Sequence, residues 1–360
     1  FTKELNVPSN YRPSGVVKSL CLIIAEDCNL ACKYCYENGS CREGTFGKLD
    51  IENLKKIARW LVSKGCKNID ILLFGGEPLV VGIPILANVI HCCDGLAVSR
   101  KLHLITNGTL LSHHKVALFE KEHLNSLQVT LDGSQEYHDS MKTFKDGRGT
   151  FNLILDNLVY AMKHNIAEEY IIRVNCTDEN IFGIEKFLRE IKNRFESPHH
   201  ITFSLGMVGR SFKVCKMQTS IDRIASNCSL SENAINEFVR LHKIIRDAGF
   251  FIPDYFAYSA LCSNKTALSI VLEPGLRATK CTSAIGIEEL SKGADDLSLF
   301  SRKTPTSLYR RCFSEECPYV PFCHLGCQHE GLIDGASIPC RICQREVLDR
   351  INTGLLRTMF

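Results

Sequence analysis

Short apolar runs alternate with amphipathic stretches along residues 18–250, and this alternation restricts the chain to a few folds. The apolar runs are rich in β-branched residues, which predicts buried strands. The predicted strands are Ser19–Ala25, Ile69–Phe74, Leu102–Thr106, Ser126–Leu131, Tyr170–Cys176 and His200–Gly206. The predicted helices include Asp50–Ser63, Thr150–Lys163, Ile181–Asn193 and Ser231–Ala248. Strands that alternate with helices form a parallel sheet with right-handed crossovers.

Six strand–helix repeats are too few for a closed eight-stranded barrel, so the sequence predicts an α/β fold with an open, partial (βα)6 barrel. Functional residues are expected at the carboxyl ends of the strands, where ligands bind in barrels and in open α/β sheets. After Phe251 the pattern changes, because residues 252–360 hold eight cysteines and little periodicity before a helix predicted near Arg345–Leu356. A small region of this kind is usually held together by metal.

The chain is therefore divided into an amino-terminal segment (1–17), the partial barrel (18–250) and a small cysteine-rich domain (251–360). Nineteen of the 360 residues are cysteine, an odd number, and no export signal is visible. A cytoplasmic location is expected, and in that reducing compartment clustered cysteines bind metal more often than they form disulfides. The net charge of +3 is too small to favour nucleic acid or an anionic membrane as a partner. No apolar run reaches the ~18 residues of a membrane span.

Cys28, Cys32 and Cys35 follow the first predicted strand directly, with the spacing CxxxCxxC. Three thiolates on one loop can ligate three irons of a [4Fe–4S] cluster and leave the fourth iron open. A tetrahedral zinc site is the alternative, and it requires a fourth ligand, which Cys41 could supply.

Further motifs follow the next strands. The second strand ends in Gly75-Gly76-Glu77-Pro78, where the glycines permit close approach of the backbone and the carboxylate suits a cationic amino group. The third ends in Thr106-Asn107-Gly108, and the fourth in Thr130-Leu131-Asp132-Gly133, followed by His138-Asp139. Arg173 and Asn175 share one face of the fifth strand because side chains alternate with a period of two.

Together with the aromatic Tyr34 before the last cysteine, these motifs resemble those of the radical S-adenosylmethionine (SAM) superfamily. The resemblance implies that Cys28, Cys32 and Cys35 are catalytic ligands of a cluster that cleaves SAM to a 5′-deoxyadenosyl radical. It implies the cofactor-binding residues Tyr34, Gly75, Gly76, Glu77, Asn107, Thr130, Lys142 and Asn175. Lys142 stands where some members have arginine, and lysine lacks the bidentate fork. For Asn175, a satisfied amide inside the barrel is the alternative.

The carboxy-terminal cysteines resemble the SPASM domain, a twin-cluster extension of radical SAM enzymes that modify peptides and proteins. The resemblance assigns Cys262, Cys281 and Cys327 to a nearer auxiliary [4Fe–4S] cluster, and Cys312, Cys317, Cys323 and Cys343 to a farther one. Cys340 either completes the nearer cluster, replaces Cys343 or is simply buried. The spacings Cys312-x4-Cys317 and Gly275-x5-Cys281 depart from the usual pattern. Three [4Fe–4S] clusters are thus expected, with zinc ribbons as the alternative for the last group.

The run from Val17 to Leu30 most resembles maturases of ribosomally made peptides, nearest to the thioether-forming sactipeptide and ranthipeptide enzymes. This implies a precursor peptide with a leader as substrate, and a low-potential electron donor such as ferredoxin or flavodoxin. Residues 1–17 are too short for a leader-binding domain, which is expected upstream or on a separate chain.

Three alternatives remain open. Anaerobic sulfatase maturation would make formylglycine, but those relatives carry an acidic residue where this chain has Thr282. Carbon–carbon or epimerising peptide chemistry is the second. A non-catalytic iron–sulfur or zinc scaffold is the third, and it leaves the motif around Glu77 without a purpose. The other cysteines are expected to pack as small hydrophobes, with Cys21 and Cys176 in the core; the remainder are Cys41, Cys66, Cys92, Cys93, Cys215 and Cys228.

Overall fold

The computed structural model describes residues 19–35, 51–63, 67–94, 99–207, 231–253, 269–274, 277–279 and 292–293. Six of its strands pair in parallel in the order β6-β5-β4-β3-β2-β1. Their bounds are β1 Ser19–Ala25, β2 Asn68–Gly75, β3 Ser99–Thr106, β4 Leu124–Thr130, β5 Ala167–Cys176 and β6 Ile201–Met207. The predicted α/β class and the parallel six-stranded sheet of a partial barrel are confirmed, and all six strands fall within two or three residues of their predicted bounds.

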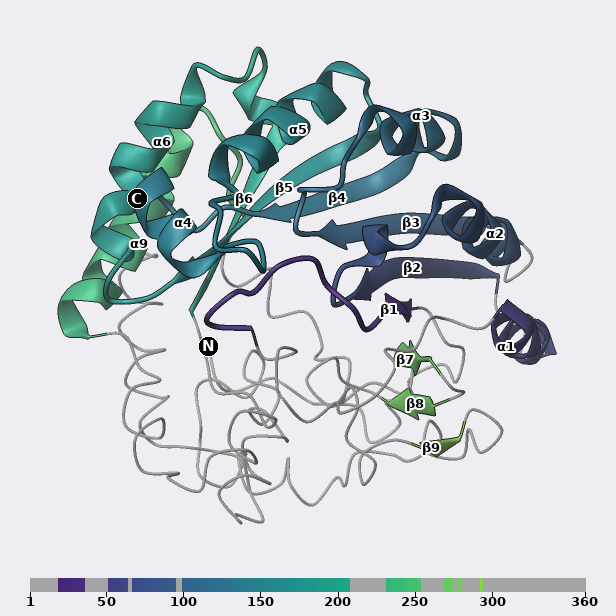
Figure 1. Ribbon diagram of the computed structural model, residues 1–360. Coiled ribbons are helices and arrows are strands. Elements are labelled where there is room, and N and C mark those ends of the chain that lie inside the picture. Colours follow the sequence, from purple (N-terminus) through teal and green to yellow (C-terminus); the bar gives the residue numbers. More distant parts are fainter. Residues whose placement is uncertain are drawn as a thin grey trace, which may run out of the picture.

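Helices lie along one face of this sheet (Figure 1). Their bounds are α1 Ile51–Ser63, α2 Ile83–Asp94, α3 His113–Glu122, α4 Gln135–Met141, α5 Phe151–Lys163, α6 Ile184–Lys192 and α9 Glu232–Asp247. Three short 3-10 helices are η1 Pro78–Val80, η2 Ile181–Gly183 and η3 Pro198–His200. The structure splits the helix predicted from Ile181 into η2 and α6, and α2, α3 and α4 were not predicted individually. Ser231 caps α9 by accepting a hydrogen bond from the Ala234 backbone N at 3.3 Å.

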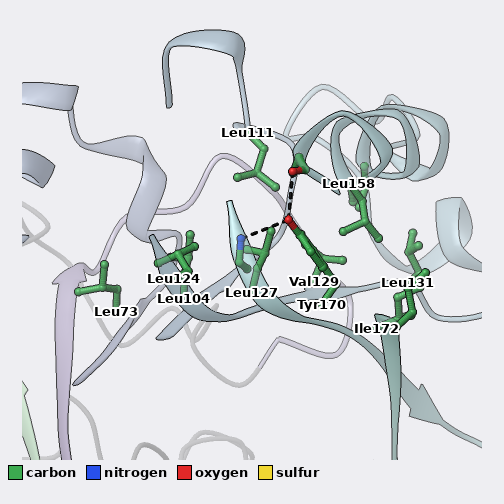
Figure 2. Close-up of a cluster of buried hydrophobic side chains, with 14 of the residues drawn as sticks. Leu73, Leu104, Leu111, Leu124, Leu127, Val129, Leu131, Leu158, Tyr170 and Ile172 are labelled. Carbon is green, nitrogen blue, oxygen red and sulfur yellow. Dashed lines mark hydrogen bonds between the residues drawn. The ribbon is translucent and has the colours of Figure 1, made fainter. Parts of the chain in front are cut away.

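The main core lies between the sheet and the helices. Alternate residues of β1, such as Leu20 and Leu22, point into it, whereas Cys21 and Ile23 pack on the opposite face against Val271. Figure 2 shows the part of this core beneath α5, where the Tyr170 hydroxyl donates to the Ala161 carbonyl (3.1 Å) and accepts from the Ala167 backbone N (3.2 Å). Cys21 and Cys176 are buried, as predicted, and so is Cys93.

The sheet continues past β1 into the region after Phe251. Strand β7, Ser269–Glu273, pairs in parallel with β1, followed by the antiparallel β8, Arg277–Thr279, and β9, Lys292–Gly293. These strands were not predicted. The helix expected near Arg345–Leu356, and the cysteines from Cys262 to Cys343, lie outside the described residues, so the boundary near residue 251 stays a prediction. Within the described ranges, no helix is both long and apolar enough to cross a bilayer.

Candidate functional site

The cysteine loop, residues 27–35, leaves the carboxyl end of β1 and passes toward α4 (Figure 1). Its backbone pairs with the segment that follows α4. The N–H of Ala31 donates to the Thr143 carbonyl at 2.8 Å, and the N–H of Lys33 donates to the Met141 carbonyl at 2.9 Å. A β-bridge between Leu30 and Phe144 extends the pairing. The loop is thus fixed at the carboxyl edge of the sheet, where the sequence predicted it.

The Cys28, Cys32 and Cys35 side chains are partly exposed. Burial raises the pKa of Cys28 to about 11. Burial also raises the pKa of Cys32, and the positive charge of Lys142 opposes that rise. At neutral pH Cys28 and Cys32 of the metal-free loop are therefore protonated, and metal binding must release their protons.

Among the described residues, no three His, Cys, Asp or Glu side chains are grouped as the ligands of one metal ion would be. Cys41, the fourth ligand considered for a zinc site, lies outside the described residues. In a [4Fe–4S] cluster each thiolate binds a different iron, so the three sulfurs need not converge on one point. The donor set of the loop, three thiols, fits a [4Fe–4S] cluster with one open iron.

The glycines of the second motif let β2 pack against the start of the cysteine loop. The Gly76 N–H donates to the Ala25 carbonyl and the Glu77 N–H to the Asp27 carbonyl, both at 2.9 Å. A Cβ added at Gly76 would lie only 2.6 Å from the carbonyl oxygens of both Glu26 and Asp27. Gly75 adopts a φ of 137°, a region that favours glycine. Close contact with the loop, rather than a turn alone, therefore explains both glycines.

The Glu77 carboxylate is fully buried between the ends of β2 and β3. Its Oε1 accepts hydrogen bonds from the Leu79 backbone N (2.9 Å) and the Thr106 hydroxyl (2.7 Å), and its Oε2 accepts one from the Asn107 backbone N (2.6 Å). Burial raises the pKa of Glu77, and these hydrogen bonds oppose the rise. The carboxylate thus braces the strand ends in this structure, and its contact with the cofactor amino group stays a prediction.

Asn107 connects the third motif to the cysteine loop. Its amide Nδ2 donates to the Asn29 side-chain oxygen at 2.9 Å and lies 3.7 Å from the Cys28 sulfur, in hydrogen-bonding geometry. Its amide oxygen accepts from the backbone N (2.9 Å) and the hydroxyl (2.7 Å) of Thr109. The side chain is therefore fixed in an orientation that directs a donor at the first cysteine.

The remaining predicted cofactor residues lie around β4 and β5. Thr130 pairs in register with Arg173, whose guanidinium donates to the Asn175 amide oxygen and the Ser204 hydroxyl, each at 3.2 Å. Lys142, at the end of α4, is only 5% exposed, and its charge acts on Cys32. The structure thus places Lys142 near the cysteine loop and Thr130 at the end of β4, while the auxiliary-cluster cysteines lie outside the described residues.

Sequence reasoning noticed the motif of Asp132, Gly133, His138 and Asp139 but assigned it no role. Buried His138 accepts from the Asp132 backbone N (3.2 Å) and contacts the Thr150 hydroxyl (3.0 Å), which donates to the Lys142 carbonyl (2.8 Å). Burial lowers the pKa of His138 to about 3, so the ring is neutral.

Asp139 caps α5, because its Oδ1 accepts from the backbone N–H groups of Thr150 (2.7 Å) and Phe151 (2.9 Å). The contacts of His138 and Asp139 hold the segment after α4, whose backbone pairs with the cysteine loop. The motif is therefore a support for the loop.

Comparison with known proteins agrees with this geometry. Residues 22–191, which run from β1 into α6, match the sequence model of the Radical SAM superfamily. This part of the chain is a radical SAM domain, which confirms the resemblance seen in the motifs.

One relative is the cysteine-type anaerobic sulfatase-maturating enzyme of Clostridium novyi (strain NT). It is 27% identical over 189 residues, which are 50% of this chain and 50% of that protein. The chain thus spans about half the length of this curated relative, and the match carries no substrate over to it.

Two solved structures share the fold. One is anSMEcpe with bound AdoMet, at a TM-score of 0.71 and 16% identity, covering 94% of this chain and 98% of that chain. The other is Streptococcus suis SuiB bound to the precursor peptide SuiA, at a TM-score of 0.60 and 17% identity, covering 92% of this chain and 76% of that chain. At these identities the likeness shows the fold alone.

Proposed function

We propose that the chain is a radical SAM maturase that modifies a ribosomally made precursor peptide by joining a cysteine sulfur to a carbon atom as a thioether. The observation that carries the radical chemistry is the loop of Cys28, Cys32 and Cys35, which backbone hydrogen bonds hold at the carboxyl edge of the sheet. A [4Fe–4S] cluster with SAM supplies one-electron cleavage of the sulfonium and a 5′-deoxyadenosyl radical that removes hydrogen from the substrate.

The residues of the chain hold and orient these groups. The three cysteine thiolates bind the cluster, and Asn107 directs a donor toward the Cys28 sulfur. Gly75 and Gly76 keep the backbone of β2 close to the loop, while Glu77 holds the strand ends together. Buried Lys142 places a positive charge near Cys32. Tyr34, Thr130 and Asn175 complete the proposed SAM site.

The thioether product requires a balanced oxidation. One hydrogen atom of the acceptor carbon ends on 5′-deoxyadenosine, the substrate thiol loses its proton to solvent, and one electron returns to an iron–sulfur centre. We assign that centre to auxiliary clusters bound by the carboxy-terminal cysteines, and the first electron to a ferredoxin or flavodoxin. The peptide substrate is favoured by the fold shared with SuiB, which has been solved with its precursor peptide.

Sulfatase maturation is the second candidate, favoured by the relative from Clostridium novyi. It would oxidise a cysteine or serine to formylglycine. Thr282 stands where such enzymes carry an acidic residue, and this difference favours the thioether reaction.

Anaerobic reconstitution tests the chemistry. With dithionite and SAM, the protein should release 5′-deoxyadenosine, and three clusters correspond to about twelve irons per chain. A Cys28→Ala variant should make none of this product, and product from that variant would contradict the assignment. With a cysteine-containing precursor peptide, a thioether shows as loss of two hydrogen atoms with sulfur retained. Loss of sulfur would identify formylglycine instead.

A further inference from the structure

We propose that Tyr34, Asp132 and Asn175 form a lock that positions the cysteine loop against the carboxyl ends of β4 and β5. In this lock the Tyr34 hydroxyl is a positioning group for the cluster ligands, separate from any contact that its ring makes with the cofactor. The inference rests on the proposed function in one respect, namely that the loop binds a cluster.

Asp132 is the centre of the lock. Its side chain is fully buried, one carboxylate oxygen accepts from the Tyr34 hydroxyl, and the other accepts from the Asn175 backbone N at 2.9 Å. Hydrogen bonds to an ionised acceptor are about twice as strong as neutral ones. A single carboxylate thus joins the cysteine loop to the end of β5.

The main chain of Asp132 is fixed as well. Its N–H donates to His138 at 3.2 Å, and its carbonyl accepts from the Asn180 amide at 2.9 Å. The same Asn180 amide donates to the Asn175 carbonyl at 2.9 Å. Because Asn180 holds both Asp132 and Asn175, the acceptor that Tyr34 meets belongs to a well-anchored part of the barrel.

Tyr34 occupies the position in the loop where anchoring has most effect, since it directly precedes Cys35 and follows Cys32 by two residues. Its hydroxyl donates a hydrogen bond to the Asp132 carboxylate and is also hydrogen-bonded to the Asn175 side chain. The hydroxyl therefore contacts both other members of the lock.

The lock complements the backbone pairing on the other side of the loop. That pairing fixes residues 30–33 through Thr143 and Met141, and the Tyr34–Asp132 bond carries the anchoring to the residue before Cys35. It also couples the loop to Asn175, a proposed SAM contact. Loss of the hydroxyl is expected to loosen the cluster in the absence of SAM.

The test compares Tyr34→Phe, which keeps the ring, with Tyr137→Phe, whose hydroxyl bonds to Thr177 at 2.9 Å and takes no part in the lock. The full chain is reconstituted without SAM, and iron release to a chelator is followed. The iron that wild type binds and a Cys28→Ala variant does not bind is assigned to the loop cluster. Tyr34→Phe should release that fraction about tenfold faster than wild type, the equivalent of one lost hydrogen bond. Tyr137→Phe should match wild type.

Electron paramagnetic resonance gives an independent readout. The reduced loop cluster of Tyr34→Phe should show broader signals than wild type, since the ligands are less uniformly placed. Asp132→Asn should also accelerate iron release, and the double variant should be no faster than the faster single variant, because both changes remove the same bond. Fully additive acceleration would overturn the lock.

Unchanged iron release in Tyr34→Phe, with only the SAM affinity reduced, would also overturn the proposal and make the hydroxyl a cofactor contact. If Asp132→Asn does not fold, Tyr34→Phe alone decides. Failure of the proposed function gives a different result, because Cys28→Ala would then hold as much iron as wild type.

Discussion

The backbone N–H of Asn107 donates a 2.6 Å hydrogen bond to the buried carboxylate of Glu77, so the ends of β3 and β2 are joined side chain to main chain. The same bond connects two sequence motifs that stand 30 residues apart. Since the Asn107 side chain also contacts Cys28, Glu77, which follows β2, is linked to the first cysteine through Asn107.

Glu77→Gln should destabilise the metal-free protein. The carboxylate accepts three hydrogen bonds, whereas an amide in its place has one acceptor oxygen and presents N–H groups to a donor. The free energy of unfolding should fall by about 2 kcal/mol in urea titrations, the cost of a buried donor left without its acceptor. Glu120→Gln, at a partly exposed pair with His164, is the control and should change it by less than about 1 kcal/mol. Equal effects at the two positions would contradict the bracing role.

Gly76→Ala should displace the cysteine loop. The added Cβ would meet the backbone carbonyl oxygens of Glu26 and Asp27, at the start of the loop, at 2.6 Å, and backbone atoms cannot rotate away as a side chain can. Gly76→Ala should therefore lack most of the loop cluster. The iron of that cluster is measured as the difference in iron content between wild type and Cys28→Ala. At Gly183 a Cβ would meet nothing within 4 Å, so Gly183→Ala should keep full iron content. A full complement of iron in Gly76→Ala would show that the close packing is not required.

The fold was predictable because its signals are local. Runs such as Ser19–Ala25 alternate with amphipathic helices, and β1 has the bounds that its apolar residues indicate. Helix α2 was not predicted because its sequence, Ile83–Asp94, is apolar almost throughout and lacks a polar face to mark the helical period. Strands β8 and β9 are only three and two residues long, too short to show a period.

The candidate site was predictable in its members but not in its contacts. The order of motifs placed Cys28, Gly76 and Asn107 at neighbouring strand ends, and the structure brings them together. That Glu77 accepts bonds from its own neighbours, and that Asp132 meets Tyr34 across 98 residues, depends on side-chain directions in three dimensions. Spacing in the sequence does not contain that information.

Lys142→Gln should lower the reduction potential of the loop cluster. The ammonium is 5% exposed, and its charge acts on Cys32, so its removal makes the reduced, more negative cluster less favourable. A unit charge several ångströms away at an effective dielectric near 20 corresponds to a shift on the order of 50–100 mV. Lys145→Gln is the control, because Lys145 is exposed and paired with Asp27 at 3.3 Å. A redox titration followed by electron paramagnetic resonance measures both, and an equal shift in the two variants would contradict the prediction.

His138 should make the stability of the metal-free protein depend on pH between about 6.5 and 3. Its pKa is lowered from 6.5 to about 3 by burial, so below pH 6.5 the unfolded chain binds a proton that the folded chain does not. The stabilisation is fully present above pH 6.5 and is lost as the pH falls toward 3. From pH 7 to pH 5 the free energy of unfolding should therefore decrease by about 2 kcal/mol through this residue. His138→Gln keeps a polar side chain that does not titrate, and its stability should fall less over the same interval. Parallel pH profiles for the two proteins, measured by denaturant titration, would show that the ring is not buried in its neutral form.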